Sequence, residues 1–167
     1  MKKLLIFLFM VSCSFIQRAD YVQNCISINF VADNSFSDVE KDMIKRALIK
    51  WQDVIGNAIH LTVRFVDLEQ NPYWRTDRIP TIYKATDGWK NKLALSLYDR
   101  PFLGLAIPES GDIFITHLGS NFYYLILHEV GHVLIGSDWH SLNKKSVMFP
   151  YFGMDITKED INKILRR

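Results

Sequence analysis

The sequence is poor in the residues that mark specialised protein classes. It has only 2 cysteines and 5 prolines among 167 residues, and no repeat, low-complexity run or linker divides it. A chain of this length can build a hydrophobic core without disulfide bonds, so we expect a single domain. With 49% hydrophobic and 23% charged residues, the composition is that of a globular protein and not of a disordered one.

The chain also lacks an excess of charge of either sign. Its 20 Lys and Arg residues nearly balance 18 Asp and Glu residues, which leaves a net charge of +2. Lys2 and Lys3 alone account for that difference. No basic stripe is present, so we do not expect nucleic acid as a partner.

The longest apolar run lies at the N-terminus. The two lysines precede an apolar run from Leu4 to Val11, and small residues follow it. This order predicts a secretion signal over residues 1–19, and therefore an extracytoplasmic protein with one domain over residues 20–167. The run is shorter than the roughly 20 residues that span a bilayer. The alternative is a buried first strand or helix.

The two cysteines lead to different expectations. Residues 10–13, MVSC, are similar to a bacterial lipoprotein processing site, in which the cysteine receives a lipid. The signal could therefore end before Cys13 and leave the protein anchored to a membrane instead of secreted. Cys25 is then a lone thiol, and its place at the start of an expected strand favours a buried, inert role.

Hydrophobic periodicity predicts an α+β domain. Strands are expected where apolar residues alternate, and helices where they recur every three or four residues after a capping residue. The expected strands are residues 25–31, 59–66, 93–97, 102–107 and 112–116, and the expected helices are 37–56, 121–135 with Ser120 as its cap, and one that begins at Thr157. Residues 67–91 show no clear element, so a functional loop and a surface excursion with its own aromatic cluster are both open interpretations.

The stretch HEVGHVLIGSDWH, residues 128–140, has the composition of a metal site. His128 and His132 are four residues apart, which places both imidazoles one turn apart on the same helix face. Zinc accepts such nitrogen ligands at about 2.0–2.1 Å. Glu129 stands where a general base toward a water molecule is needed, so the pattern predicts a catalytic zinc site. The alternative is a solvated helix face that carries these residues by chance.

In this context the chain resembles the metzincin zinc endopeptidases, and most of all the matrixin, or matrix-metalloproteinase, group. The resemblance rests on HEVGHVL, on the pair His140-Ser141 and on SVMFP at Ser146–Pro150. It implies a five-stranded mixed sheet, an active-site helix and a small C-terminal subdomain after Gly136. It also implies a cleft between an edge strand near Leu103–Ile107 and the helix that carries His128.

The resemblance implies three histidine ligands and a Met-turn. His128 and His132 would bind zinc, Glu129 would be the catalytic residue, and Met148 would form the apolar floor beneath the ligands. The family pattern HExxHxxGxxH is not kept, because the glycine and the third histidine both come later in this chain.

The identity of the third ligand is therefore open. The family's spacing from the second histidine points to Asp138, and carboxylate oxygen is an acceptable zinc ligand. The spacing to Met148, together with the following Ser141, favours His140. If Asp138 is not a ligand, we expect it to orient the imidazole of a ligand without contacting the metal itself.

One catalytic zinc ion is expected, and no assignment of calcium follows from the sequence. The family's long loop with structural zinc and calcium is expected to be missing, because only residues 98–101 separate the third and fourth expected strands. His60 and His117 are the two other histidines, too few for a second zinc site.

The function that the resemblance implies is a zinc-dependent endopeptidase that hydrolyses extracellular proteins or peptides as a monomer. Pro150-Tyr151-Phe152 resembles the wall of the pocket for the residue after the cleaved bond, or else belongs to the core. A zinc-binding but inactive surface protein that acts as a binding module is the alternative from another class. The presence of Glu129 favours the enzyme, because a purely structural site needs no base.

Overall fold

The computed structural model describes residues 25–68, 79–86, 88–97, 102–151 and 153–166. The expected secretion signal with Cys13 lies outside the described residues, as do Phe152 and much of the 67–91 stretch.

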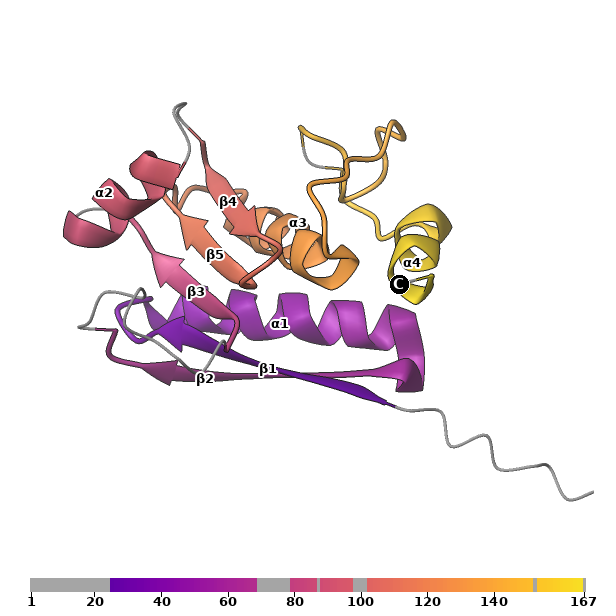
Figure 1. Ribbon diagram of the computed structural model, residues 1–167, viewed down its shortest axis with the longest axis horizontal. Helices are drawn as coiled ribbons and strands as arrows, with labels where there is room; N and C mark the ends of the chain where they lie inside the picture. The colour runs from indigo at the N-terminus through magenta and orange to yellow at the C-terminus, as the bar shows by residue number, and fades with distance from the viewer. Residues whose placement is uncertain (1–24, 69–78, 87, 98–101, 152, 167) are drawn as a thin grey trace, which may run out of the picture.

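The described chain forms a five-stranded mixed sheet and four α-helices (Figure 1). This confirms the expected α+β class. The strands are β1 (Ile26–Asp33), β2 (Ile59–Val66), β3 (Thr81–Lys84), β4 (Gly104–Ile107) and β5 (Asp112–Ile115). The helices are α1 (Asp38–Ile55), α2 (Gly88–Leu97), α3 (Phe122–Ile135) and α4 (Lys158–Leu165), with a short 3-10 turn at Gly56–Ala58.

The strand order in the sheet is β2-β1-β3-β5-β4. Strands β2, β1, β3 and β5 are parallel, and β4 alone runs antiparallel to its neighbour β5. Because β4 stands at the end of this order, it is an edge strand, and it lies against α3. This arrangement places one open strand edge beside the helix that carries the histidines (Figure 1).

The main core lies between the sheet and the pair α1 and α3. Phe30 of β1 is opposite Val63 of β2, and both belong to or pack against this core, as the alternation predicts. Ile26 is an exception, because it is 61% exposed at the start of its strand. Trp51 joins the two helices: its ring is buried in α1 and its Nε1 donates to the Leu127 carbonyl in α3 at 2.8 Å.

Most helix ends follow the expected capping residues. α1 begins with a capping box formed by Ser37 and Glu40, and α4 with one formed by Thr157 and Asp160. The cap of α3 is Asn121 and not Ser120 as predicted, and its side chain makes no capping hydrogen bond. α3 ends at Gly136, whose φ of 71° lies in the left-handed region that favours glycine.

The predicted strand at residues 93–97 is wrong, because these residues form the second half of α2. Ala94 is buried and Leu93 is half-buried, whereas Leu95 and Leu97 are exposed. Lys90, on the same face as Leu93 and Ala94, forms an ion pair with the buried Asp33 at the end of β1. A helical spacing therefore fits this segment better than strand alternation.

The third strand is instead β3, inside the stretch where no element was expected. It lies between β1 and β5, and Thr81, Ile82 and Tyr83 are all buried. A strand buried on both faces shows no alternation, so its periodicity gave no signal. The connection between the third and fourth strands is residues 85–103 and contains α2. The prediction that only residues 98–101 separate these two strands was therefore wrong, and it was the reason for expecting no long loop there.

α2 covers part of the opposite face of the sheet. Tyr83 and Phe114 stack there with ring centroids 4.7 Å apart, and Ala85 and Ala94 complete a second buried cluster. Among the helices that the structure describes, none has the length and apolar character that crossing a membrane requires. Cys25 is exposed, contrary to its expected burial.

Candidate metal and catalytic site

The middle of α3 carries three polar side chains in an otherwise apolar setting. His128, Glu129 and His132 are 4%, 4% and 6% exposed. The helix can hold them there because its other buried residues are hydrophobic and fix it against the sheet and α1. Buried polar groups at this depth need partners, and both histidines have one.

Backbone carbonyls orient the two imidazoles of α3. Nδ1 of His128 donates to the Val147 carbonyl at 2.7 Å, and Nδ1 of His132 donates to the Ser137 carbonyl at 3.0 Å. Each Nε2 therefore keeps its lone pair, and the two Nε2 atoms are 3.1 Å apart. Two acceptors that face each other so closely call for a cation between them.

His140 completes the group from the segment after α3. The ligand atoms of His128, His132 and His140 all lie within 4.8 Å of one another. The centroid of the His140 ring is 5.2 Å from that of His128 and 4.7 Å from that of His132. The three histidines are positioned to bind a metal ion, and His140 is the exposed member.

Asp138 does not join the three histidines. Its side chain is exposed and lies on the wall of the same cleft. It makes no hydrogen bond to His132, whose Nδ1 is bonded to the Ser137 carbonyl. The orienting role expected for Asp138 thus falls to a backbone carbonyl.

Met148 is fully buried against α3. A Cβ atom at Gly131 would lie 2.3 Å from the Met148 Sδ, so the absence of a side chain at Gly131 allows this close packing. The Met148 carbonyl accepts from the Ser141 N–H at 2.9 Å. The turn at Met148 is therefore joined to the residue that follows His140.

α4 anchors this turn. The buried Asp160 accepts hydrogen bonds from Ser146 Oγ at 2.7 Å and from the Thr157 N–H at 2.7 Å. Ser146 Oγ in turn accepts from the Met148 N–H at 2.9 Å. Ser141 Oγ donates to Glu159 of the same helix at 2.9 Å. The first turn of α4 thus holds both the Met148 turn and the His140 segment.

Glu129 lies against the edge strand β4. Its carboxylate accepts a hydrogen bond from the Ala106 N–H. A Cβ atom at Gly104 would lie 2.7 Å from Glu129 Oε1 and 2.8 Å from Leu125 Cδ1. Glu129 can therefore occupy this place only because position 104 has no side chain.

Burial shifts the pKa values of the three polar residues of α3 in the metal-free protein. It raises the pKa of Glu129 to about 8, against the opposing effect of the hydrogen bond from Ala106. It lowers the pKa of His128 and of His132 to about 4, against their hydrogen bonds to backbone carbonyls. Both imidazoles are therefore neutral near pH 7, as metal binding requires.

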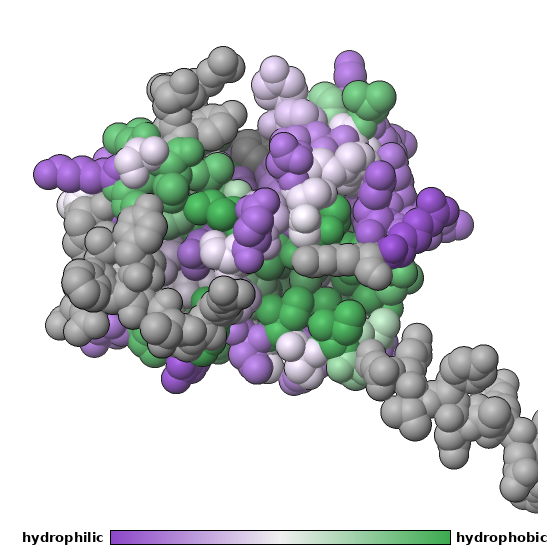
Figure 2. All heavy atoms as spheres, viewed as in Figure 1, coloured by the Kyte–Doolittle hydropathy of each residue, from purple (hydrophilic) through white to green (hydrophobic). Residues whose placement is uncertain are grey.

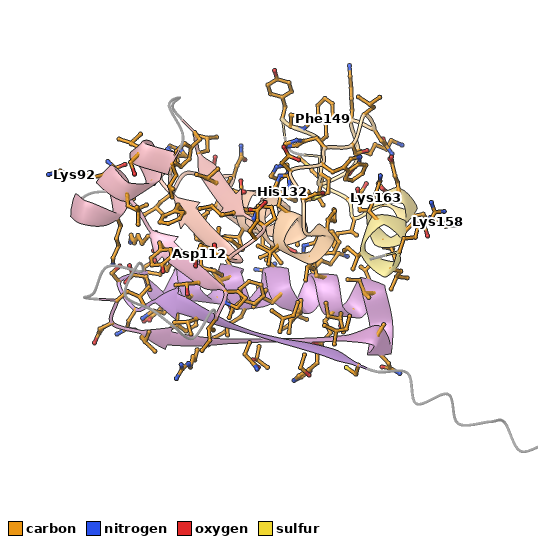
Figure 3. All side chains as sticks on the ribbon, viewed as in Figure 1. Lys92, Asp112, His132, Phe149, Lys158 and Lys163 are labelled. Carbon is orange, nitrogen blue, oxygen red and sulfur yellow. The ribbon has the colours of Figure 1, made fainter. Side chains whose placement is uncertain are left out.

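A cleft runs between β4 and the segment after α3, above these groups. Figure 2 shows the molecule hollowed between the two walls, and Figure 3 shows His132 beside the segment that carries Phe149. The lining residues are Phe102, Leu103, Gly104, Leu105, Ala106, Leu125, His128, Glu129, His132, Asp138, His140, Pro150 and Tyr151. Tyr151 is 82% exposed, so it is a wall residue and not a core residue.

Comparison with known proteins rests on structure. No family model matches the sequence, and no curated protein matches it either. Among solved structures, metalloproteinase-II from Bacteroides fragilis is similar with a TM-score of 0.56 and 11% sequence identity. The match covers 84% of this chain and 52% of that one.

The chain has the fold of a metalloproteinase. It spans about half the length of the metalloproteinase that it matches, and at this identity the likeness concerns the fold alone. The structural match and the three clustered histidines agree with a metalloprotease.

Several residues of the site were missed by the sequence analysis. Gly104 had a signal, because a glycine inside a strand indicates a close approach of another group. No sequence signal marked the carbonyls of Val147 and Ser137, because every residue has a backbone carbonyl. The link from Asp160 to Ser146 was also not expected, although the capping role of Asp160 was.

Proposed function

We propose that this chain is a zinc-dependent endopeptidase with a metzincin, matrixin-like catalytic domain. The observation that carries the proposal is the convergence of His128, His132 and His140, with Glu129 buried beside them in a cleft. Three imidazole ligands suit zinc, and a catalytic zinc site leaves a further position for water or substrate.

His128, His132 and His140 would hold the ion, and Met148 would form the floor beneath them. We prefer His140 to Asp138 as the third ligand because only His140 shares the 4.8 Å cluster. A zinc ion bound there would act as a Lewis acid that acidifies a water molecule and polarises a peptide carbonyl.

Glu129 is proposed as the catalytic residue. Its carboxylate is fixed by the Ala106 N–H, and burial raises its pKa to about 8. A zinc ion beside it would favour the ionised form, and burial makes that carboxylate a stronger base than an exposed one, so it can take a proton from an attacking water and pass it to the leaving amine. Removal of this group should therefore reduce turnover far more than it reduces substrate binding.

The open edge of β4 offers a place for the substrate backbone. The Leu103 carbonyl accepts from the Thr116 N–H, and Leu105 is opposite Phe114, so these residues turn toward β5. Gly104 and Ala106 then direct their backbone groups to the open edge. Since the Ala106 N–H is bonded to Glu129, both groups of Gly104 and the Ala106 carbonyl remain for an added peptide strand.

The proposed substrates are extracellular proteins or peptides, and the proposed setting is extracytoplasmic. The protein would act as a monomer that is secreted, or anchored to a membrane if Cys13 carries a lipid. The extracytoplasmic setting and the lipid anchor rest on the N-terminal sequence pattern alone, whereas the substrate class and the monomeric state rest on the resemblance to metzincins.

The test is cleavage of a mixed peptide library by the zinc-loaded domain, with Glu129→Gln and a chelated sample beside it. We expect cleavage by the loaded protein that is lost in both other samples. A folded, zinc-loaded protein that cleaves no peptide would contradict the proposal and favour the inactive binding module.

A further inference from the structure

Asp138 is a charged residue of the cleft that the proposed zinc site does not use. Its side chain is exposed and lies on the cleft wall, outside the histidine cluster. Among the residues that the structure describes, none forms a hydrogen bond or ion pair with its carboxylate. An exposed carboxylate beside a proposed reaction centre is available to a substrate.

No Lys or Arg side chain among the described lining residues neutralises this charge, and a zinc ion on the three histidines would be the one positive charge beside it. The other carboxylate of the cleft, that of Glu129, is buried against Ala106. Lys163 lies near the neighbouring residue, but its Nζ is over the Trp139 ring at 5.0 Å from the centroid. Apolar cleft walls strengthen the attraction of such a charge for a cation.

The backbone around Asp138 is held on both sides. The Ser137 carbonyl is bonded to His132, and the Trp139 N–H donates to Ser137 Oγ at 3.4 Å. Trp139 packs against the main core, and the Ser141 N–H is bonded to the Met148 carbonyl. Asp138 is therefore presented by a fixed segment, which favours selective recognition over adaptable contact.

Asp138 also lies close to the proposed reaction centre. It lines the same cleft as His128 and His132, and it precedes His140 by two residues in the chain. A group that reaches Asp138 from the cleft would thus lie beside the ligands proposed for zinc.

We propose that Asp138 determines specificity by binding a cationic group of the peptide next to the scissile bond. This inference rests on the proposed peptidase function. The cation would be the side chain of a Lys or Arg residue or the α-ammonium group of the peptide. The remaining walls, which include Leu103, Leu105 and Tyr151, would contact apolar parts of the substrate.

The experiment compares matched peptides with wild type, Asp138→Asn and the control Asp53→Asn, whose carboxylate is exposed on α1 outside the cleft. One arm uses N-acetylated peptides that differ only in Lys or Gln at positions flanking the cleaved bond. The other uses peptides without Lys or Arg that have a free or an acetylated N-terminus. The readouts are kcat/KM and the Kd of each peptide for zinc-loaded Glu129→Gln protein, with and without the Asp138→Asn change.

We expect the cationic peptide of one arm to be preferred by about fivefold in wild type and Asp53→Asn, in both readouts. The preference should fall toward one in Asp138→Asn, and the arm that shows it identifies the source of the cation. Cleavage without any charge preference, or a preference that persists in Asp138→Asn, would overturn this inference and leave the peptidase standing. Failure to cleave or bind any peptide would overturn the proposed function and this inference together.

Discussion

The position of the Glu129 carboxylate depends on a single missing side chain. In Gly104→Ala the new Cβ would lie 2.7 Å from Glu129 Oε1, so the carboxylate has to move. We expect kcat/KM to fall about tenfold to a hundredfold, because a displacement of about 1 Å at a catalytic group costs that much. Zinc affinity should change little, since the atoms nearest to a Cβ at residue 104 belong to Glu129 and Leu125 and not to a histidine.

Steady-state cleavage and a competitive zinc titration measure the two quantities. Glu109→Ala, an exposed change in the turn after the same strand, is the control and should keep full activity. Unchanged kcat/KM in Gly104→Ala would show that Glu129 does not need its present position.

Buried ionisable residues should give the chelated protein a stability maximum. Burial lowers the pKa of His128 and His132 from the ordinary 6.5 to about 4, so between these values the unfolded chain binds more protons. The free energy of unfolding then falls as the pH drops from 6.5 toward 4. Burial raises the pKa of Glu129 from 4.5 to about 8, so the folded chain binds the extra proton and stability falls as the pH rises across that range.

Below about pH 6.5 the two histidines raise the free energy of unfolding with pH more than Glu129 lowers it. Above that pH the histidines of the unfolded chain have lost their protons and only the effect of Glu129 remains, so the maximum lies at about pH 6.5. Urea unfolding of the chelated protein at a series of pH values measures this. Glu129→Gln should remove the decline toward pH 8. A wild-type stability that rises steadily up to pH 8 would contradict the assignment.

Among the secondary-structure elements, α4 has the clearest effect on the site. Asp160 at its first turn accepts from Ser146 and Thr157, and Ser146 holds the Met148 N–H. Asp160→Ala would leave buried donors without an acceptor and remove the capping box. We expect it to lower the free energy of unfolding by about 2–4 kcal/mol.

The same change should accelerate zinc loss, because the Met148 turn also supports the segment of His140. Urea unfolding and the rate of zinc transfer to a chelator measure both effects. Asn162→Ala, at an exposed position on the same helix, is the control. Equal stability of the two variants would show that α4 does not anchor the turn.

Elements with clear periodicity were predictable, and short apolar ones were not. The alternation of β2 and the capping box of α1 are local signals, and both were confirmed. Residues 93–97 are a short apolar run that fits a strand or a helix equally well. The choice is made by contacts distant in sequence, namely Lys90 with Asp33 and the packing of Ala94 in the second core cluster.

The candidate site divides in the same way. The spacing of His128, Glu129 and His132 is a helix property, so it was readable from the chain. His140 was favoured by its distance to Met148, and the structure brings it to the other two histidines. The close approach of the Glu129 carboxylate to Gly104 could not be predicted from the sequence, because it depends on how α3 packs against β4.

For the whole molecule, zinc should contribute to stability as well as to chemistry. The metal would tie α3 to the segment that carries His140, and it would bind the folded chain far better than the unfolded one. A free concentration a thousandfold above Kd adds about 4 kcal/mol, which raises Tm by about 10 °C. Thermal unfolding with zinc and with chelator measures the shift, and equal Tm values would contradict a metal site at this place.

The central claim is that His128, His132 and His140 hold one zinc ion in the fold of a metalloproteinase. A competitive zinc titration of wild type, His140→Ala and Asp138→Ala tests it most directly. The account predicts one zinc per wild-type chain, an affinity at least about a hundredfold weaker in His140→Ala, and little change in Asp138→Ala. Tight binding by His140→Ala together with loss in Asp138→Ala would contradict it and make the carboxylate the third ligand.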